Sequence, residues 1–272
     1  GISISGSKLM EKNAIEFSGS YQNLAPFYGL IPTNVTFYKV PQGGTFSTRW
    51  ISKLDNDKGL FKMNFSKSFT KSGIEINDPF IPGAKLIHFD RFPDLRGYFS
   101  ETFRASDFVH HDLNIFPNGI LQTNESFSYK NVLRGLHFQW NPNMGKLVRT
   151  ISGHMVDLIL DLREGSPTLG KIAAFDMPTS PSDTSTSWIW VPEGCAHGNY
   201  FLEDSYIEYF CSGSYNGECE AGVSPFAQDI DWSICDVNLK SKFFELKDLF
   251  IATPKDINGL SVKEWLSRPE AN

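Results

Sequence analysis

Short apolar stretches separated by glycine, proline, asparagine and aspartate recur from residue 74 to about residue 232. Residues 146–152 and 155–162 show the pattern, and Gly153 and His154 between them predict a turn. The chain contains 23 phenylalanines, 9 tyrosines and 6 tryptophans, which favour strands over helices in such stretches. The repetition predicts an antiparallel barrel or jelly roll, because barrel closure removes exposed strand edges.

The two ends of the chain differ from this central pattern. Residues 1–72 are polar and rich in serine, asparagine and lysine, and within them residues 34–40 and 45–52 predict two strands joined by a turn at 41–44. We therefore predict an N-terminal extension with a β-hairpin, to which the sequence assigns no chemistry. Apolar residues at helical spacing in 242–250 and 262–266 predict helices that cap the barrel, within one domain of residues 73–272.

One stretch of the central region places two cations and an imidazole close together. Arg134 and His137 lie in an apolar run, and Lys146 follows shortly after. In a regular strand Arg134, Leu136 and Phe138 would point to one face and His137 to the other, unless a bulge intervenes. The stretch could hold a base and an anion-binding clamp on rigid strands. A buried histidine satisfied by hydrogen bonds, flanked by two surface cations, is the structural alternative.

Composition limits the classes of partner and compartment. The length of 272 residues allows one large domain, or one domain plus an extension, whose core needs no disulfide or metal. A net charge of -6 argues against a nucleic-acid binder. Four cysteines without a CxxC pair predict neither a zinc site nor a disulfide framework. Without a recognisable signal peptide, or an apolar run near the ~18 residues of a membrane span, we expect a cytoplasmic protein that does not bind membranes.

Six segments stand in the order FPDLRGYFSE at 92–101, QTNES at 122–126, VLRGLHFQ at 132–139, KLVR at 146–149, DLREGSPT at 161–168 and WVPEGCAHG at 190–198. Their residues and spacing resemble the dTDP-4-dehydrorhamnose 3,5-epimerase family over about residues 74–260. The resemblance implies a mostly β, cupin-like jelly roll with C-terminal helices, preceded here by the N-terminal extension. It also implies a homodimer, a nucleotide-diphosphate 4-keto-6-deoxy sugar as substrate, and no cofactor.

Epimerisation beside a ketone needs a base, a positive charge at the enolate oxygen, and an acid on the opposite face of the sugar ring. The resemblance implies that His137 is the base and that Lys146 meets the oxygen; an exposed strand-end lysine is the alternative for Lys146. It further implies that Asp256 orients His137. A helix N-cap is the alternative role for Asp256.

The remaining site residues follow from the same resemblance. Arg96 and Arg134, with Arg149 as a further candidate, would hold the diphosphate, a task suited to guanidinium groups. Gln122 and Asn124 alternate along a strand, share a face and would contact the nucleotide or sugar, unless Asn124 forms a turn. Glu101 would hold one of these arginines, unless it is a surface glutamate, and Tyr215 would stack on the nucleotide base.

Many cupins bind a metal through a His-x-His pair, a glutamate and a later histidine. Here His197 could be the later histidine, but Gln139 stands where the second histidine of the pair would be. We therefore predict a metal-free site in which His197 lines the pocket.

The position of the acid departs from the family pattern. An ungapped count from His197 reaches Phe210, and Tyr209 beside it would face the other side of a regular strand. If Phe210 occupies the acid position, the acid is missing, and only a bulge or register shift would bring Tyr209 into the pocket. We therefore expect epimerisation at C3 and/or C5 of the sugar through an enolate, in deoxysugar biosynthesis, and favour an impaired or single-centre reaction. C3-only epimerisation, 3,4-ketoisomerisation and non-catalytic binding of a nucleotide sugar remain open as alternatives.

Overall fold

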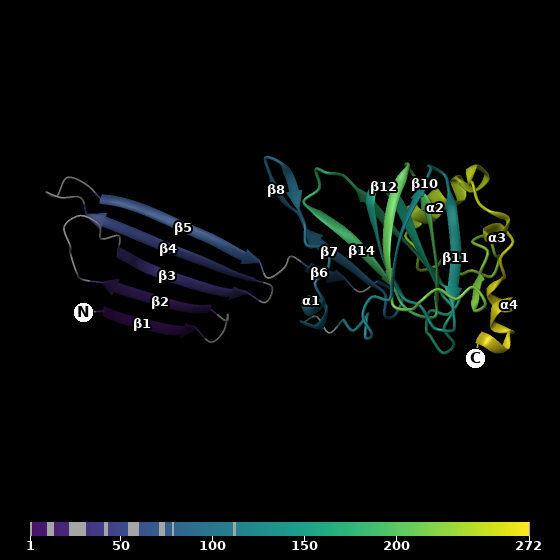
Figure 1. Ribbon diagram of the computed structural model, residues 1–272, viewed down its shortest axis with the longest axis horizontal. Helices are drawn as coiled ribbons and strands as arrows, with labels where there is room; N and C mark the ends of the chain where they lie inside the picture. The colour runs from purple at the N-terminus through teal and green to yellow at the C-terminus, as the bar shows by residue number, and fades with distance from the viewer. Residues whose placement is uncertain are drawn as a thin grey trace. The chain divides into compact units, whose positions relative to one another are not determined.

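A computed structural model describes residues 2–9, 14–21, 31–40, 43–53, 60–70, 74–77, 79–110 and 113–271. The chain divides into two compact units, Gly1–Gly73 and Ile74–Asn272, and each is described by itself (Figure 1). In the described part of the chain, no helix is long and apolar enough to cross a membrane.

The first unit is a five-stranded antiparallel sheet with its strands in chain order. The strands are β1 (Ile2–Leu9), β2 (Ala14–Tyr21), β3 (Ile31–Val40), β4 (Gly43–Lys53) and β5 (Leu60–Thr70). β3 pairs with β4 up to Val40 opposite Gly43, so Gly43 and Gly44 belong to a strand. Residues 41 and 42 of the predicted turn lie outside the described residues. The sequence pattern indicated only this one hairpin of the sheet.

The second unit is built from ten antiparallel strands and a small hairpin. The ten strands are β6 (Ile74–Asn77), β7 (Lys85–Asp90), β10 (Gln122–Ser128), β11 (Leu133–Gln139), β12 (Lys146–Asp161), β13 (Ile172–Thr179), β14 (Ser185–Val191), β15 (Cys195–Phe201), β16 (Ser205–Cys211) and β17 (Glu220–Gly222). The hairpin consists of β8 (Phe92–Asp94) and β9 (Gly97–Phe99). The predicted cupin-like jelly roll is confirmed.

Strand β12 links the two sheets of the barrel. Its first half pairs with β14 and β16, and its second half pairs with β13 and β15. The prediction of two strands separated by a turn is therefore wrong, because the chain continues through Gly153 as one strand. Gly153 has a φ of +93°, and a Cβ atom there would lie 2.4 Å from the carbonyl oxygen of Asp204. Glycine is needed here because the strand bends at a positive φ and the backbone of Asp204 lies close by, and the chain does not reverse direction.

Helices follow the strands at the C-terminus, as predicted. They are α2 (Val237–Glu245), the 3-10 helix η2 (Lys247–Leu249), α3 (Pro254–Ile257), α4 (Val262–Leu266) and the 3-10 helix η3 (Pro269–Ala271), and an earlier helix α1 (Ala105–His110) lies after the small hairpin. The helix predicted at 242–250 begins earlier, because the Asp236 carboxylate caps the backbone N–H groups of Asn238 and Leu239. The predicted range 262–266 matches α4.

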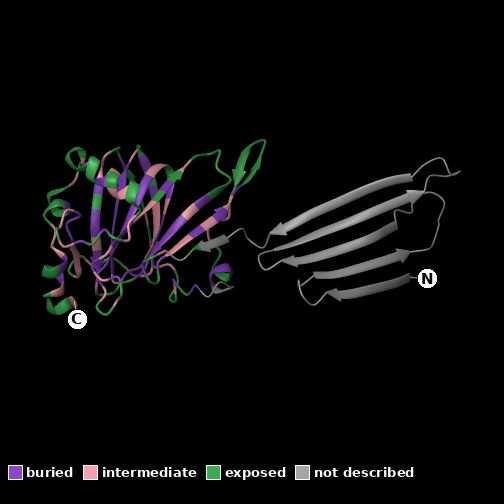
Figure 2. Ribbon diagram, turned by 180° about the vertical axis from the view of Figure 1, so that it is seen from behind, coloured by how far each residue is buried: buried purple, intermediate pink, exposed green. Residues whose placement is uncertain are grey.

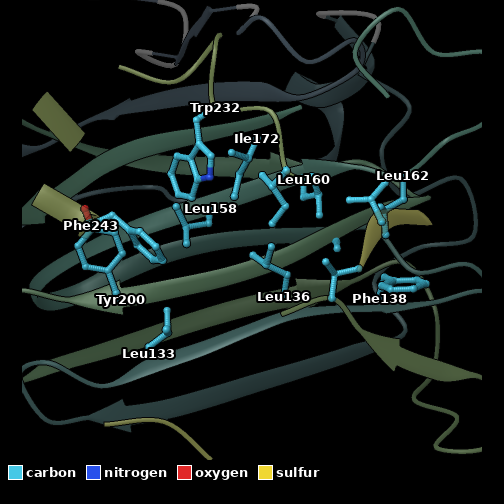
Figure 3. Packing of buried hydrophobic residues seen from close by; sticks show 14 of the residues in the cluster. Leu133, Leu136, Phe138, Leu158, Leu160, Leu162, Ile172, Tyr200, Trp232 and Phe243 are labelled. Carbon is cyan, nitrogen blue, oxygen red and sulfur yellow. The ribbon is translucent and has the colours of Figure 1, made fainter. Parts of the chain in front are cut away.

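Alternation along β12 divides the apolar side chains between two cores. Leu158 and Leu160 point outward to a core shared with α2 and α4, where Phe243 and Trp265 are buried (Figure 3). Met155 and Ile159 point inward to a core inside the barrel. Buried residues accordingly run along the strands of this unit (Figure 2). Asp157, between Met155 and Ile159, is therefore carried into the barrel interior.

A third core covers the outer face of the other sheet. Trp188 and Phe89 pack there against Phe108 of α1, and Phe210 joins them at the edge. Both outer faces are thus partly covered by helices or loops, and the polar residues of the inner face are available for chemistry.

Candidate active site

A bulge in β11 sets the direction of the first histidine. Arg134 pairs with Asn199 and His137 pairs with His197 on β15, and the register shifts between the two pairs. Leu136 and Phe138 face the outer core, whereas Arg134 is exposed and donates from Nε to Ser128 Oγ at 2.9 Å. A bulge therefore intervenes, which the sequence left open, and Arg134 does not share a face with Leu136 and Phe138 as it would in a regular strand.

His137 lies against a buried carboxylate. Its Nε2 is 2.7 Å from Asp256 Oδ1, an ion-pair contact whose angle falls short of a straight hydrogen bond. The same Oδ1 accepts a hydrogen bond from the backbone N–H of Gly135 at 3.2 Å. Nδ1 of His137 is the ring nitrogen that this contact leaves for a substrate.

Asp256 is held by its helix as well as by the histidine. Thr253 is the N-cap of α3, and Asp256 is the third helical residue, whose Oδ2 accepts from the Thr253 hydroxyl at 2.6 Å. The alternative that Asp256 is the N-cap is therefore wrong, because Thr253 occupies that position and Asp256 is the N3 residue of the capping box. The capping box fixes the carboxylate while leaving Oδ1 for His137.

The surroundings of His137 favour its neutral form, and Lys146 lies within electrostatic reach. Burial lowers the pKa of His137, with the carboxylate of Asp256 opposing the shift and the ammonium of Lys146 adding to it. Lys146 retains some exposed surface, but protein groups surround its ammonium, and this burial lowers its pKa as well. A neutral imidazole and a lysine amine within electrostatic reach of each other are a suitable pair for enolate chemistry.

A second histidine and carboxylate stand on the neighbouring strands. Nε2 of His197 lies 2.6 Å from Asp157 Oδ2, and both side chains are buried. Burial raises the pKa of Asp157, and His197 and Lys146 oppose that shift. His197 pairs across the sheet with His137, so the two imidazoles come from adjacent positions of one face.

The pairing of β12 with β16 decides which aromatic residue faces the interior. Lys146 lies opposite Cys211 and Val148 opposite Tyr209, so Tyr209 shares the inner face with Lys146. Phe210 lies opposite Leu147, and its ring packs on Trp188 at 5.0 Å and Phe103 at 6.1 Å on the outer face.

The interpretation that Phe210 occupies the acid position is therefore wrong. The ungapped count from His197 fails by one residue, and Tyr209 is the phenol on the inner face. Burial raises the pKa of Tyr209, which keeps the phenol protonated, and the positive charge of Arg134 lies within electrostatic reach.

The polar residues of β10 face the same interior. Gln122 lies opposite Cys211 and Asn124 opposite Tyr209. Gln122 Nε2 donates to Asn124 Oδ1 at 3.0 Å, and its Oε1 accepts from the backbone N–H of Tyr215 at 2.9 Å. Asn124 therefore lies in a strand, and the alternative that it forms a turn is wrong.

Three other predicted residues do not lie on the inner face that carries His137 and Lys146. Arg96 is highly exposed on the β8–β9 hairpin and binds Asp94, and Glu101 binds Arg104 rather than any of the three named arginines. Arg149 lies on the outer face, where its guanidinium binds Glu208 and stacks over Trp188 at 4.7 Å. The role predicted for Arg149 is wrong, because strand alternation turns it away from the barrel interior.

Asp157, Glu220 and Lys255 were not predicted from the sequence. Asp157 was detectable as a charged residue within the largely apolar, buried second half of β12. Glu220 and Lys255 form an ion pair beside His137, but they lie far apart along the chain and no local pattern joins them. Among the described residues no group of histidine, cysteine and carboxylate side chains could hold a metal.

Two carboxylate-paired histidines, an enclosed lysine and a phenol inside a jelly roll are groups suited to proton transfer. The family model for dTDP-4-dehydrorhamnose 3,5-epimerase matches residues 78–263. The chain belongs to the dTDP-4-dehydrorhamnose 3,5-epimerase family, a family of isomerases.

Relatives of this family share about a third of the aligned residues. The epimerase of Neisseria gonorrhoeae is 37% identical over 193 residues, which cover 71% of this chain and 53% of that protein. This chain thus spans about half the length of that relative. The epimerase of Methanothermobacter thermautotrophicus is 36% identical over 187 residues, covering 68% of this chain and 92% of that protein.

Solved structures have the same fold. The 3,5-epimerase of Legionella pneumophila, determined with dTDP-4-keto-L-rhamnose, has a TM-score of 0.60 at 29% identity and covers 73% of this chain and 96% of its own. The dTDP-4-dehydrorhamnose 3,5-epimerase of Sulfolobus tokodaii has a TM-score of 0.57 at 32% identity and covers 70% of this chain and 96% of its own.

Proposed function

We propose that the protein epimerises a nucleotide-linked 4-keto-6-deoxyhexose at C3 and C5 through an enolate, in deoxysugar biosynthesis. The observation that carries the proposal is His137, paired with Asp256 at 2.7 Å and lying beside the ammonium of Lys146. The complex of the Legionella relative with dTDP-4-keto-L-rhamnose supports the substrate class.

Each residue has one chemical task. Neutral His137 takes the proton from the carbon next to the C4 ketone, and Asp256 stabilises the imidazolium that forms. The electron pair of the broken C–H bond moves to the C4 oxygen, where Lys146 stabilises the negative charge. Arg134 binds the diphosphate, and Gln122 and Asn124 contact the nucleotide or sugar.

Tyr209 is the proposed acid on the opposite face. Its phenol stays protonated because burial raises its pKa, and it shares the inner face with Lys146. It donates its proton to the enolate carbon and regains one from solvent, while the His137 imidazolium releases the abstracted proton to solvent, so the configuration inverts and the protons balance. The position of Phe210 on the outer face and of Tyr209 on the inner face supports epimerisation at both centres over single-centre epimerisation or mere binding.

We further propose that the active form is a cytoplasmic homodimer. Phe92, Leu95 and Phe99 of the β8–β9 hairpin are exposed apolar side chains, and a second copy would cover them. Arg96 on this hairpin would then meet a diphosphate in the partner's site. Four free thiols in the described chain support a reducing compartment. Sedimentation at micromolar concentration should give a dimer mass, and a monomer would contradict this part.

The proposed site lies entirely within residues 74–272, so we assign the chemistry to that unit and none to residues 1–72. The test is conversion of dTDP-4-keto-6-deoxyglucose by the full chain, followed by chemical reduction of the ketone and determination of the configuration at C3 and C5. We expect inversion at both centres. His137→Asn should abolish it. An unchanged configuration with the wild-type protein would refute the proposed activity.

A further inference from the structure

Gln139 uses its whole amide group to join the loop after β16 to the loop after β11. It is the last residue of β11, two positions after His137, and it is only 5% exposed. Nε2 donates to the carbonyl oxygens of Pro142 at 2.7 Å and Ser214 at 3.0 Å, and Oε1 accepts from the backbone N–H of Asn216 at 2.7 Å. These partners fix the orientation of the amide, because carbonyl oxygens need its nitrogen and an N–H needs its oxygen.

A second glutamine, Gln122, binds Tyr215, which lies between Ser214 and Asn216. Gln122 Oε1 accepts from the backbone N–H of Tyr215 at 2.9 Å. Ser214, Tyr215 and Asn216 are therefore bound in succession by side chains from two different strands. The Asn216 amide adds a bond to the carbonyl oxygen of Asn141 at 2.8 Å.

The loop held in this way presents one aromatic side chain. Tyr215 is 61% exposed although its backbone is fixed on both sides. A Cβ atom on Gly217 would lie 3.0 Å from the Tyr215 hydroxyl, so the ring folds over its own loop. Glu220 accepts a hydrogen bond from Tyr215, and it also pairs with Lys255 next to Asp256.

We propose that Gln139 is a positioning residue for the nucleotide base, acting through Tyr215. This inference rests on the proposed function and on the role that the family resemblance implies for Tyr215, stacking on the nucleotide base. A ring that is already ordered binds a base without the cost of ordering the loop on binding. Gln139 and His137 lie on the same strand. Strand β11 therefore positions both the proposed catalytic base, His137, and the Tyr215 ring on which the nucleotide base would stack. A histidine at position 139 could not replace the amide, since neutral imidazole offers one donor and one acceptor.

The test compares two ligands that differ in the nucleoside. Gln139→Met keeps a similar shape and removes all three hydrogen bonds, so the dissociation constant for dTDP should rise about 10-fold, within the range of one base-stacking contact. The dissociation constant for inorganic diphosphate should stay unchanged, because that ligand does not reach Tyr215. In turnover, the effect should fall on KM rather than kcat. Gln228→Met, at an exposed glutamine outside the site, is the matched control and should change neither constant.

A double variant separates positioning from general loss of structure. If Gln139 acts through Tyr215, Gln139→Met should add little further loss of dTDP affinity in a Tyr215→Leu background. Equal losses for dTDP and diphosphate, or fully additive losses, would overturn the inference. If Gln139→Met unfolds, Gln139→Glu, which keeps the acceptor for Asn216 and removes both donors, takes its place under the same expectations.

The wild-type measurements distinguish this inference from the proposed function. A wild-type protein that inverts the sugar, while Gln139→Met retains full dTDP affinity, would refute the role of Gln139 alone. A wild-type protein that binds dTDP with the predicted dependence on Gln139 but never turns over the sugar would refute the epimerase and leave the role of Gln139 standing.

Discussion

Replacing Tyr209 by phenylalanine removes one hydroxyl group and leaves the ring that packs beside the inner core. A general acid typically contributes ~10²–10⁴-fold, or about 3–5 kcal/mol of the barrier. We therefore expect inversion to slow by that factor in Tyr209→Phe. His137 still removes the proton, so exchange of carbon-bound hydrogen with solvent should continue with retention. Because the ring remains, the free energy of unfolding should change by less than about 1 kcal/mol.

Phe210→Tyr is the opposite case and serves as the control. Its new hydroxyl would enter the aromatic cluster with Trp188 and Phe103. Phe210 is only partly buried, so the unpaired hydroxyl should cost about 1 kcal/mol, at the low end of the usual ~1–3 kcal/mol. Thermal unfolding should show this loss, while product configuration read by NMR stays wild-type. The assignment of Tyr209 as the acid would be refuted if Phe210→Tyr lost epimerase activity while Tyr209→Phe kept it, or if Tyr209→Phe inverted the sugar at the wild-type rate.

Three further predictions test other parts of the site and fold. Arg134→Ala should raise the dissociation constant for dTDP in calorimetry by ~10-fold or more, because a hydrogen bond to a charged group is lost; an unchanged affinity would contradict the clamp. Neutral His137 is the active form and burial lowers its pKa, so the acid limb of kcat/KM should lie below the ordinary ~6.5. Asp256→Asn should move that limb to still lower pH, because Asp256 raises the pKa of His137; movement to higher pH would contradict the pairing. Gly153→Ala should destabilise the protein by at least about 2 kcal/mol in denaturant unfolding, given its φ of +93° and the 2.4 Å approach of Asp204.

Local patterns predicted strands better than they predicted the joins between them. The apolar stretch 155–162 was correctly predicted to be a strand, although its sequence does not show which of its side chains face the barrel interior. Gly153 was assigned to a turn, since a glycine needed for a reversal and one needed for a close approach look the same in sequence. Only the pairing of β12 with two different sheets separates these cases.

The candidate site shows the same limit. The motif around His137 was recognisable, and Asp256 reached it from 119 residues away only through the fold. The count to Phe210 assumed one residue per position, whereas the direction of Tyr209 depends on its pairing with β12. Sequence spacing does not reveal a register shift, because pairing partners are chosen by packing across the whole barrel.

The most direct test of the proposed activity is an NMR time course with dTDP-4-keto-6-deoxyglucose in heavy water. The account predicts deuterium at both C3 and C5 with inversion at each centre, and no deuterium beyond the uncatalysed background with His137→Asn. It would be contradicted by a wild-type protein that binds dTDP but leaves both carbons protonated, or by wild-type exchange rates in His137→Asn.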